Sequence, residues 1–281
     1  MIKRKMYKYL INWKQKKDKS ALIIKGARQV GKSYLVREFG RNEYEGYIEI
    51  NFLKNPLYKN IFKGNLSAEE IFKRLSAYIP NLKIIPFKTL LFLDEIQVCA
   101  EARTAVKFLV EDGSVDVISS GSLLGLSYLE DDDKNVTEPT SLPVGYEEQI
   151  TMYSLDFEEF LWAKGYKEYQ IEDLYKHMLD LKPLSTVQYD VMMSNFKEYM
   201  VIGGMPAIVN QFVTQKNYSG TLELQRQILL DYEETSIRIP MLPHIRSLNL
   251  SNSVAIVAYE VLRHQGFEAF QMEGQLHHYK W

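Results

Sequence analysis

The chain of 281 residues is long enough for one large α/β domain or two smaller domains. Its net charge of −2 gives no overall attraction to nucleic acid or anionic lipid, and its single cysteine, Cys99, cannot form a disulfide within the chain. The sequence holds no apolar run of the roughly 18 residues that a membrane span requires. We therefore expect a protein of the reducing cytoplasm that does not enter a membrane.

The first 19 residues contain eight basic side chains and one acidic one. Ile2, Leu10 and Trp13 recur on one helical face, which predicts an amphipathic helix within residues 1–19 that docks on the rest of the protein with its lysines in water. The alternative is that these lysines bind nucleic acid together with the rings of Tyr7 and Trp13.

An apolar run from Ala21 to Ile24 leads into the sequence GARQVGKS. The run predicts a buried strand, and the residues from Lys32 onward predict a helix. The pattern G-x-x-x-x-G-K-S, the P-loop or Walker A motif, lets the backbone curl so that successive N–H groups converge on phosphate oxygens. Lys32 is expected to reach the outer phosphates and the Ser33 hydroxyl to bind Mg²⁺. The alternative is a glycine turn beside a solvated lysine. The residues predicted to bind nucleotide are Gly26, Ala27, Arg28, Gln29, Val30, Gly31, Lys32, Ser33 and Tyr34.

A second apolar run, from Thr89 to Leu93, predicts a central parallel strand. It ends in Asp94-Glu95, at the carboxyl edge of the sheet where open α/β sheets bind ligands. Asp94 is expected to orient Mg²⁺ through a coordinated water, and Glu95 to polarise the attacking water as a general base. The alternative is that both carboxylates only favour the start of the helix that begins near Ala100.

A further predicted strand, from Val115 to Ser120, leads into Gly121-Ser122. We assign Ser122 as the residue that senses the γ-phosphate, with Ser120 as the second choice and a simple turn serine as the alternative. For the like-charge run Glu130 to Asp133 we expect a solvated loop.

Helical patterns dominate after Glu168. A predicted helix ends at Gly203-Gly204, and Pro206 suits the first turn of the next helix. The sequence GGMP at this point is either a hinge that moves with nucleotide state or a tight turn between helices. His277-His278 invites a metal site, but the sequence supplies no nearby carboxylate or thiol to complete it.

Together these segments resemble prokaryotic AAA-type ATP-binding proteins that join a P-loop domain to a C-terminal domain of unknown function. The resemblance runs from about Trp13 to Tyr232. It rests on the motifs GARQVGKS (26–33), INF (50–52), LLFLDEIQ (90–97), GSLLG (121–125), LPVG (142–145), MYSLDFEEFL (152–161) and YMVIGGMP (199–206).

The resemblance implies ATP binding and hydrolysis with Mg²⁺. Carried over by motif, Lys32 and Ser33 hold phosphates and metal. Asp94 supports Mg²⁺ and Glu95 is the catalytic acidic residue, while Ser122 falls where the sensor strand of the family ends.

The implied fold is an α/β P-loop domain of the AAA+ type, a parallel sheet flanked by helices, followed by a mainly α-helical C-terminal domain. We expect the N-terminal helix within residues 1–19, the ATPase domain over 20–165 and the helical domain over 166–281.

Two departures from the family pattern stand out. Relatives often carry a basic residue after the glycine of the LPVG segment, where this chain has Tyr146. The resemblance fades after about Asp231, where relatives continue into a longer region, so we expect a truncated or diverged member.

We therefore predict an ATPase that works as a homo-oligomer, in which a neighbouring subunit donates an arginine. The alternative is a regulatory module that binds nucleotide with negligible turnover and acts with a protein or nucleic-acid partner. A small-molecule kinase is disfavoured because Glu95 would waste the nucleotide on water, and a GTPase because no [NT]-K-x-D segment is found. The arginine candidates are Arg103, Arg238, Arg246 and Arg263.

Overall fold

The computed structural model describes residues 2–122 and 145–230. The chain forms two compact units, Met1–Gln225 and Arg226–Trp281. Several predictions fall outside the described residues, namely those on Glu130 to Asp133, Arg238, Arg246, Arg263 and His277-His278.

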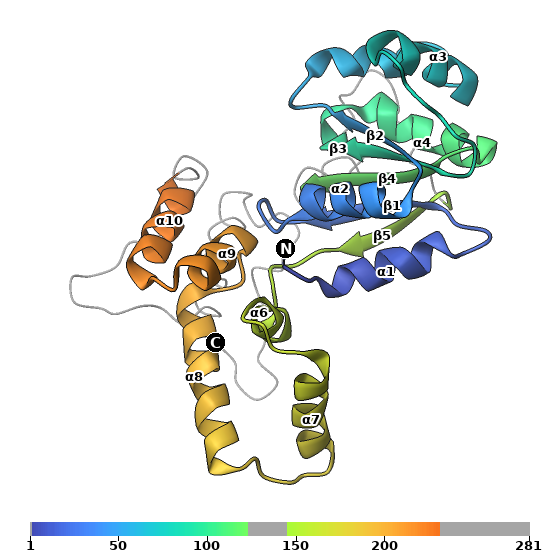
Figure 1. Ribbon diagram of the computed structural model, residues 1–281. Coiled ribbons are helices and arrows are strands. Elements are labelled where there is room, and N and C mark those ends of the chain that lie inside the picture. The colour runs from blue at the N-terminus through green and yellow to red at the C-terminus, as the bar shows by residue number, and fades with distance from the viewer. Residues whose placement is uncertain (1, 123–144, 231–281) are drawn as a thin grey trace, which may run out of the picture. The chain divides into compact units, whose positions relative to one another are not determined.

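A five-stranded parallel sheet with the order β2-β3-β4-β1-β5 forms the centre of the first unit (Figure 1). Every residue of β3 is buried, as expected of a central strand that is covered on both faces. The predicted parallel α/β sheet is thereby confirmed. The strands are β1 (Ala21–Gly26), β2 (Gly46–Asn51), β3 (Thr89–Asp94), β4 (Asp116–Ser122) and β5 (Glu147–Thr151).

Helices cover both faces of this sheet (Figure 1). Successive residues of β1 point to opposite faces, so Leu22 packs in one apolar cluster and Ile23 in the other. The Leu22 side is covered by α1 (Lys5–Lys14) and α2 (Lys32–Glu43). The Ile23 side is covered by α3 (Ala68–Tyr78), α4 (Ala100–Asp112) and the short 3₁₀ turns η1 (Pro56–Phe62) and η2 (Ile96–Val98).

The basic N-terminal segment is held on the protein by α1. Leu10 and Trp13 of this helix are fully buried against β1 and α2. Most of the lysines around it pair with carboxylates of the same unit, so this segment offers less free positive charge than its composition indicates. The ion pairs are Lys3–Glu168, Lys5–Asp156, Lys5–Glu158, Lys16–Glu148 and Lys19–Asp116.

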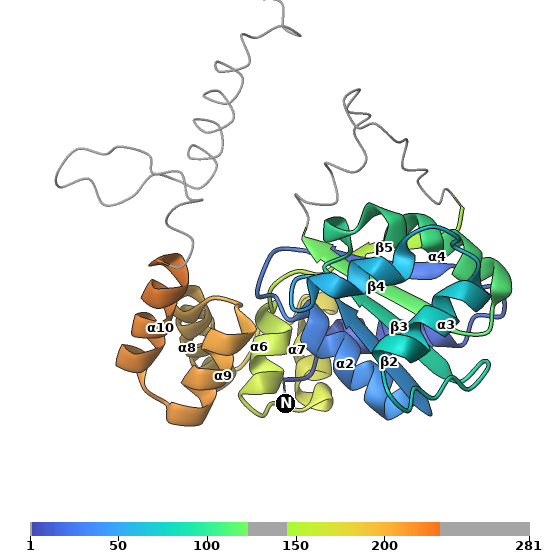
Figure 2. The same cartoon turned by 90° about the horizontal axis from the view of Figure 1, so that it is seen from above.

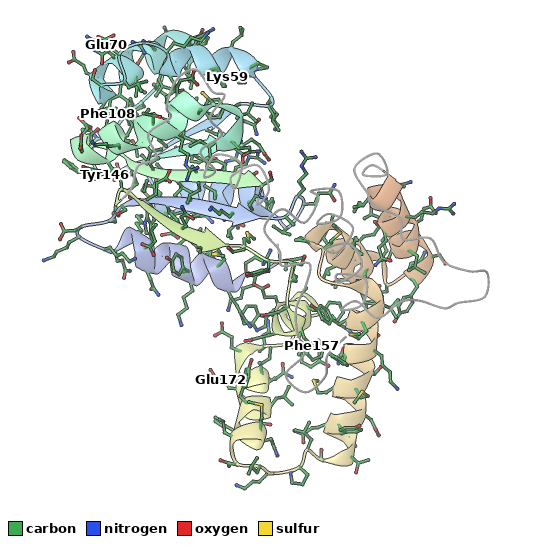
Figure 3. All side chains as sticks on the ribbon, turned by 180° about the vertical axis from the view of Figure 1, so that it is seen from behind. Lys59, Glu70, Phe108, Tyr146, Phe157 and Glu172 are labelled. Carbon is green, nitrogen blue, oxygen red and sulfur yellow. The ribbon has the colours of Figure 1, made fainter. Side chains whose placement is uncertain are left out.

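Helices follow the sheet over the rest of the described chain. Figure 2 shows α6, α8 and α9 lying together. Phe157 of α6, labelled in Figure 3, makes an edge contact with Phe196 of α8 at 5.4 Å between ring centroids. None of the described helices is long and apolar enough to cross a bilayer. The helices are α6 (Phe157–Ala163), α7 (Glu168–Leu179), α8 (Thr186–Ile202), α9 (Pro206–Gln215) and α10 (Tyr218–Leu230).

Candidate functional site

The loop GARQVGKS joins β1 to α2, since β1 ends at Gly26 and α2 begins at Lys32. Gly31 has a φ of 97°, in the left-handed region that glycine tolerates best. A Cβ on Gly26 would lie 2.3 Å from the carbonyl oxygen of Met152, the residue after β5, so only glycine fits there. The sequence therefore forms the strand, loop and helix that a phosphate-binding loop requires.

The predicted nucleotide-binding residues differ in exposure. Ala27, Arg28 and Gln29 are exposed at the outside of the loop, and Tyr34 is 59% exposed on the first turn of α2. Val30, in contrast, is buried beneath the loop. The outer residues can thus reach a ligand, whereas Val30 anchors the loop to the core.

Lys32 is buried, and its ammonium donates to the carbonyl oxygens of Gly26 and Ala27, each at 2.8 Å. Burial lowers the pKa of Lys32, and the nearby carboxylates of Glu95 and Asp94 oppose that change. The Lys32 ammonium is thus held inside the loop by two of the loop's own backbone carbonyls.

Asp94 ends β3 and gathers polar side chains from three other segments. Its Oδ1 accepts hydrogen bonds from the hydroxyls of Ser33, at 2.8 Å, and Ser120, and its Oδ2 accepts from the Asn51 amide at 2.7 Å. Asn51 on β2 and Ser120 on β4 are both level with Asp94 in the sheet. The carboxylate, only 1% exposed, is therefore fixed in place at the carboxyl edge of the sheet.

Arg37 of α2 places a second cation beside this carboxylate. Its guanidinium forms hydrogen bonds of 2.8 to 2.9 Å with both carboxylate oxygens of Glu49, and one nitrogen lies 3.9 Å from Asp94 Oδ2. Burial raises the pKa of Glu49, but hydrogen bonds from Arg37 and Tyr47 outweigh this and leave the pKa below its usual range. Arg37 and Glu49 therefore form a charged pair next to the Asp94 site.

Glu95 directly follows Asp94 and leaves the strand with a φ of 59°. A residue with a side chain is uncommon in this left-handed conformation and is often found at functional sites. Its carboxylate accepts a hydrogen bond of 2.6 Å from the side-chain amide of Gln97. The turn separates Glu95 from the sheet, and Gln97 holds its carboxylate.

The two candidate serines occupy different places on β4. Ser120 pairs in register with Asp94 and donates to its carboxylate. Ser122 pairs in register with Gly26, at the start of the phosphate-binding loop. Ser120, the second choice from the sequence, is therefore the serine joined to Asp94, while Ser122 stays the predicted sensor of the γ-phosphate.

Sequence reasoning assigned no role to Asn51, Gln97 or Arg37. The first two lie within the motifs INF and LLFLDEIQ, and Asn51 ends its strand as Asp94 does. A polar residue at the carboxyl end of a neighbouring parallel strand was a usable signal for Asn51. No comparable signal marks Arg37, whose contact with Glu49 depends on how α2 packs on β2.

Arg103 is poorly suited to act on a neighbouring subunit. It lies within α4, is 4% exposed and pairs with Glu147 of β5 at 3.4 Å. An arginine that acts in the site of a neighbouring subunit must lie at the surface of its own subunit. The burial of Arg103 therefore argues against this candidate.

Tyr146 lies just before β5, at the edge of the sheet domain (Figure 3). Its hydroxyl donates to Glu111 at 2.8 Å, and the Lys107 ammonium lies 5.4 Å from its ring centroid. Because β5 runs parallel to β1, the start of β5 is at the opposite edge of the sheet from the loop at Gly26. The residue after Gly145 therefore does not face a phosphate bound by the loop of the same chain.

Comparison with known proteins matches the part of the chain that contains the phosphate-binding loop and Asp94. Residues 18–161, just over half of the chain, match the family described as AAA domain. Among solved structures, a Walker-type ATPase of Pyrococcus abyssi is similar with a TM-score of 0.49 and 13% sequence identity, over 84% of this chain and 75% of that one.

Curated proteins match a shorter part of the chain. Putative tRNA (cytidine(34)-2'-O)-methyltransferases of Listeria innocua and Listeria monocytogenes are 50% and 52% identical over 62 residues, which are 22% of this chain and 35% of theirs. That of Bacillus subtilis is 41% identical over 56 residues. The chain thus spans about a third of the length of the curated relatives it matches.

Proposed function

Because the chain belongs to the AAA domain family, we propose that it binds Mg²⁺·ATP at its phosphate-binding loop and hydrolyses the bond between the β- and γ-phosphates. The observation that carries this proposal is the convergence of Lys32, Ser33 and Asp94 at the carboxyl edge of a parallel sheet. The Ser33 hydroxyl lies 2.8 Å from the Asp94 carboxylate, so the two motifs form one site.

Lys32 and the loop backbone would hold the phosphates. α2 begins at Lys32, so the positive N-terminal end of this helix faces the loop, and the N–H groups of the loop add further donors. In the proposed complex the Lys32 ammonium exchanges the carbonyls of Gly26 and Ala27 for phosphate oxygens. Because Lys32 is buried, this charge interaction is screened less than one in water.

The residues around Asp94 suit Mg²⁺, since the ion prefers hard oxygen ligands and keeps several waters. Ser33 would bind it directly, and Asp94 would hold one of its waters. When bound, the ion would neutralise charge on the β- and γ-phosphates. Asn51 and Ser120 contribute by fixing the Asp94 carboxylate.

Glu95 is the proposed general base. It would take a proton from the water that attacks the γ-phosphate, a role that contributes about 10²–10⁴ in rate. The hydrogen bond from Gln97 would orient the carboxylate for that step.

A homo-oligomer is part of this proposal, because an arginine from a neighbouring subunit would complete the charge stabilisation. Release of inorganic phosphate from Mg²⁺·ATP over a protein concentration series tests both points. The wild type should release phosphate, with specific activity that rises with concentration, and a Lys32→Ala variant should not. ATP binding without phosphate release would instead select the alternative, a regulatory module with negligible turnover.

The matches to methyltransferases favour a second candidate function. The matches span 62 residues at 50% and 52% identity, although they cover only 35% of those methyltransferases. We propose that the chain binds tRNA; methyl transfer is not included, because the match covers about a third of such an enzyme. Filter binding of radiolabelled tRNA to the full chain should show saturable retention in about 0.15 M salt. No retention, or equal retention of a DNA duplex, would contradict this candidate.

A further inference from the structure

Arg4 precedes α1 and connects three separate segments through one guanidinium. Its Nη1 donates to the carbonyl oxygen of Val30 at 2.8 Å, its Nη2 to that of Tyr153 at 2.7 Å, and its Nε to the Glu159 carboxylate at 3.1 Å. The side chain is only 9% exposed. Arg4 therefore ties the phosphate-binding loop to the residues after β5 and to α6.

The acceptor on α6 is itself held firmly. Glu159 also accepts the backbone N–H of Lys5 at 2.7 Å, and its carboxylate and that of Asp156 form a reciprocal capping box at the start of the helix. Its side chain is 6% exposed. Arg4 is thus anchored to a rigid point rather than to a mobile surface carboxylate.

The acceptor in the loop is well placed to influence phosphate binding. Val30 and Gly31 share one planar trans peptide, so the Val30 carbonyl and the Gly31 N–H point in opposite directions. Holding the carbonyl on one side therefore orients the N–H on the other. Successive N–H groups of such a loop are its phosphate donors.

We propose that Arg4 is a positioning residue for the nucleotide site: by fixing the Val30 carbonyl, it presets the Gly31 N–H for a phosphate oxygen. This inference rests on the proposed function. Each of the three guanidinium nitrogens donates to a protein acceptor, and the one that reaches the phosphate-binding loop holds a backbone carbonyl, so the role we assign to Arg4 acts through the loop.

An arginine suits this role because its planar fork presents donors in fixed, separate directions, whereas lysine carries all its donors on one nitrogen. The same contacts give a structural role to Tyr153 and Glu159 of the motif MYSLDFEEFL. Arg4 is one of eight basic residues among the first 19, and no sequence pattern distinguishes it from the others.

Two measurements on Arg4→Met and Arg4→Lys test the proposal, with Lys8→Met as the matched control, since Lys8 is an exposed cation of the same segment. Amide hydrogen exchange over residues 26–34 of the nucleotide-free protein reports on the loop itself. Calorimetric titration with ATP reports on affinity. Both Arg4 variants should exchange faster over 26–34 and bind ATP about tenfold or more weakly, because hydrogen bonds from a charged group are lost. Lys8→Met should match the wild type in both.

The proposal is overturned if Arg4→Met keeps wild-type exchange over 26–34 and wild-type ATP affinity. Wild-type values in Arg4→Lys would also overturn it, since charge alone would then suffice. If the wild type binds no ATP, the proposed function fails, and the exchange rates alone decide the role of Arg4. If neither Arg4 variant folds, Glu159→Gln takes their place: it should speed exchange over 26–34, and unchanged exchange would count against the proposal.

Discussion

The Ser33 hydroxyl donates a hydrogen bond of 2.8 Å to the Asp94 carboxylate, although the two residues lie 61 positions apart in the chain. β4 lies between β3, which ends at Asp94, and β1, which leads into the loop before Ser33, and Ser120 of β4 contacts the same carboxylate. Asn51, from the strand on the other side of β3, supplies a further donor. The loop and the acidic strand are therefore joined before any ligand binds.

Asp94→Asn should weaken ATP binding in Mg²⁺ by about tenfold or more but change it little in EDTA. The neutral amide would lack the negative charge that we expect to hold a water of the ion, so the loss should depend on Mg²⁺. The amide would also set a donor against one of the donors around position 94, which costs about 1–3 kcal/mol of folding stability with or without the ion. Calorimetry with and without Mg²⁺ measures this, and Asp112→Asn, at an exposed position on α4, serves as the control. Equal Mg²⁺ dependence in Asp94→Asn and wild type would show that Asp94 does not support the ion.

Glu95→Gln should lower kcat for phosphate release by about 10²–10⁴ while ATP affinity is retained. Gln97→Leu should lower kcat less, because Glu95 would keep its carboxylate and lose only the 2.6 Å hydrogen bond that orients it. Single-turnover phosphate release separates the chemical step from binding. A variant at Glu95 with unchanged turnover would rule out this residue as the base.

Gly204→Ala should destabilise the protein by about 1–3 kcal/mol, as overpacking does. Its Cβ would lie 2.2 Å from the carbonyl oxygen of Leu155, whose N–H donates to the Gly204 carbonyl at 2.7 Å. These contacts hold the GGMP segment against the residues just before α6.

Thermal unfolding compares this variant with Gly220→Ala, where a Cβ would meet only the ends of two glutamine side chains at 3.2 Å. Position 220 is in α10, so alanine there should not lower the Tm. An equal Tm for Gly204→Ala and wild type would mean that the turn relaxes to accept a side chain.

Glu148→Gln should lower stability at neutral pH and have little effect in acid. Hydrogen bonds from Lys16, at 2.6 Å, and Tyr9 lower the pKa of Glu148 below its ordinary value of 4.5. The carboxylate therefore stabilises the folded state above about pH 4.5, and this contribution is lost as the pH falls through the lowered pKa. Because the Lys16 pair is partly exposed, we expect less than about 1 kcal/mol.

Urea unfolding at neutral pH and at about pH 3 measures this difference. A gap between variant and wild type that persists unchanged in acid would show that Glu148 acts through packing and not through its charge.

Much of the fold was predictable because buried parallel strands read as continuous apolar runs. Thr89 to Leu93 is such a run, and the loop at Gly26 carries its own spacing signal. The choice between Ser120 and Ser122 was not predictable. Residues two apart share a face of a strand, and only the register with Asp94 separates them.

Contacts between segments far apart in the chain could not be predicted from the sequence either. The hydrogen bond of Arg4 to Val30 depends on where α1 docks on the sheet. The burial of Arg103 depends on how α4 packs against β5. No local pattern marks either residue, since an arginine in a helix or a basic segment is usually solvated.

Titration of the wild type and Lys32→Ala with ATP, in Mg²⁺ and in EDTA, tests the central claim most directly. We expect the wild type to bind ATP more tightly with Mg²⁺, and Lys32→Ala to bind at least about 100-fold more weakly, because a buried charge-assisted contact to phosphate is lost. Equal affinity of both proteins for ATP would contradict a nucleotide site at this loop.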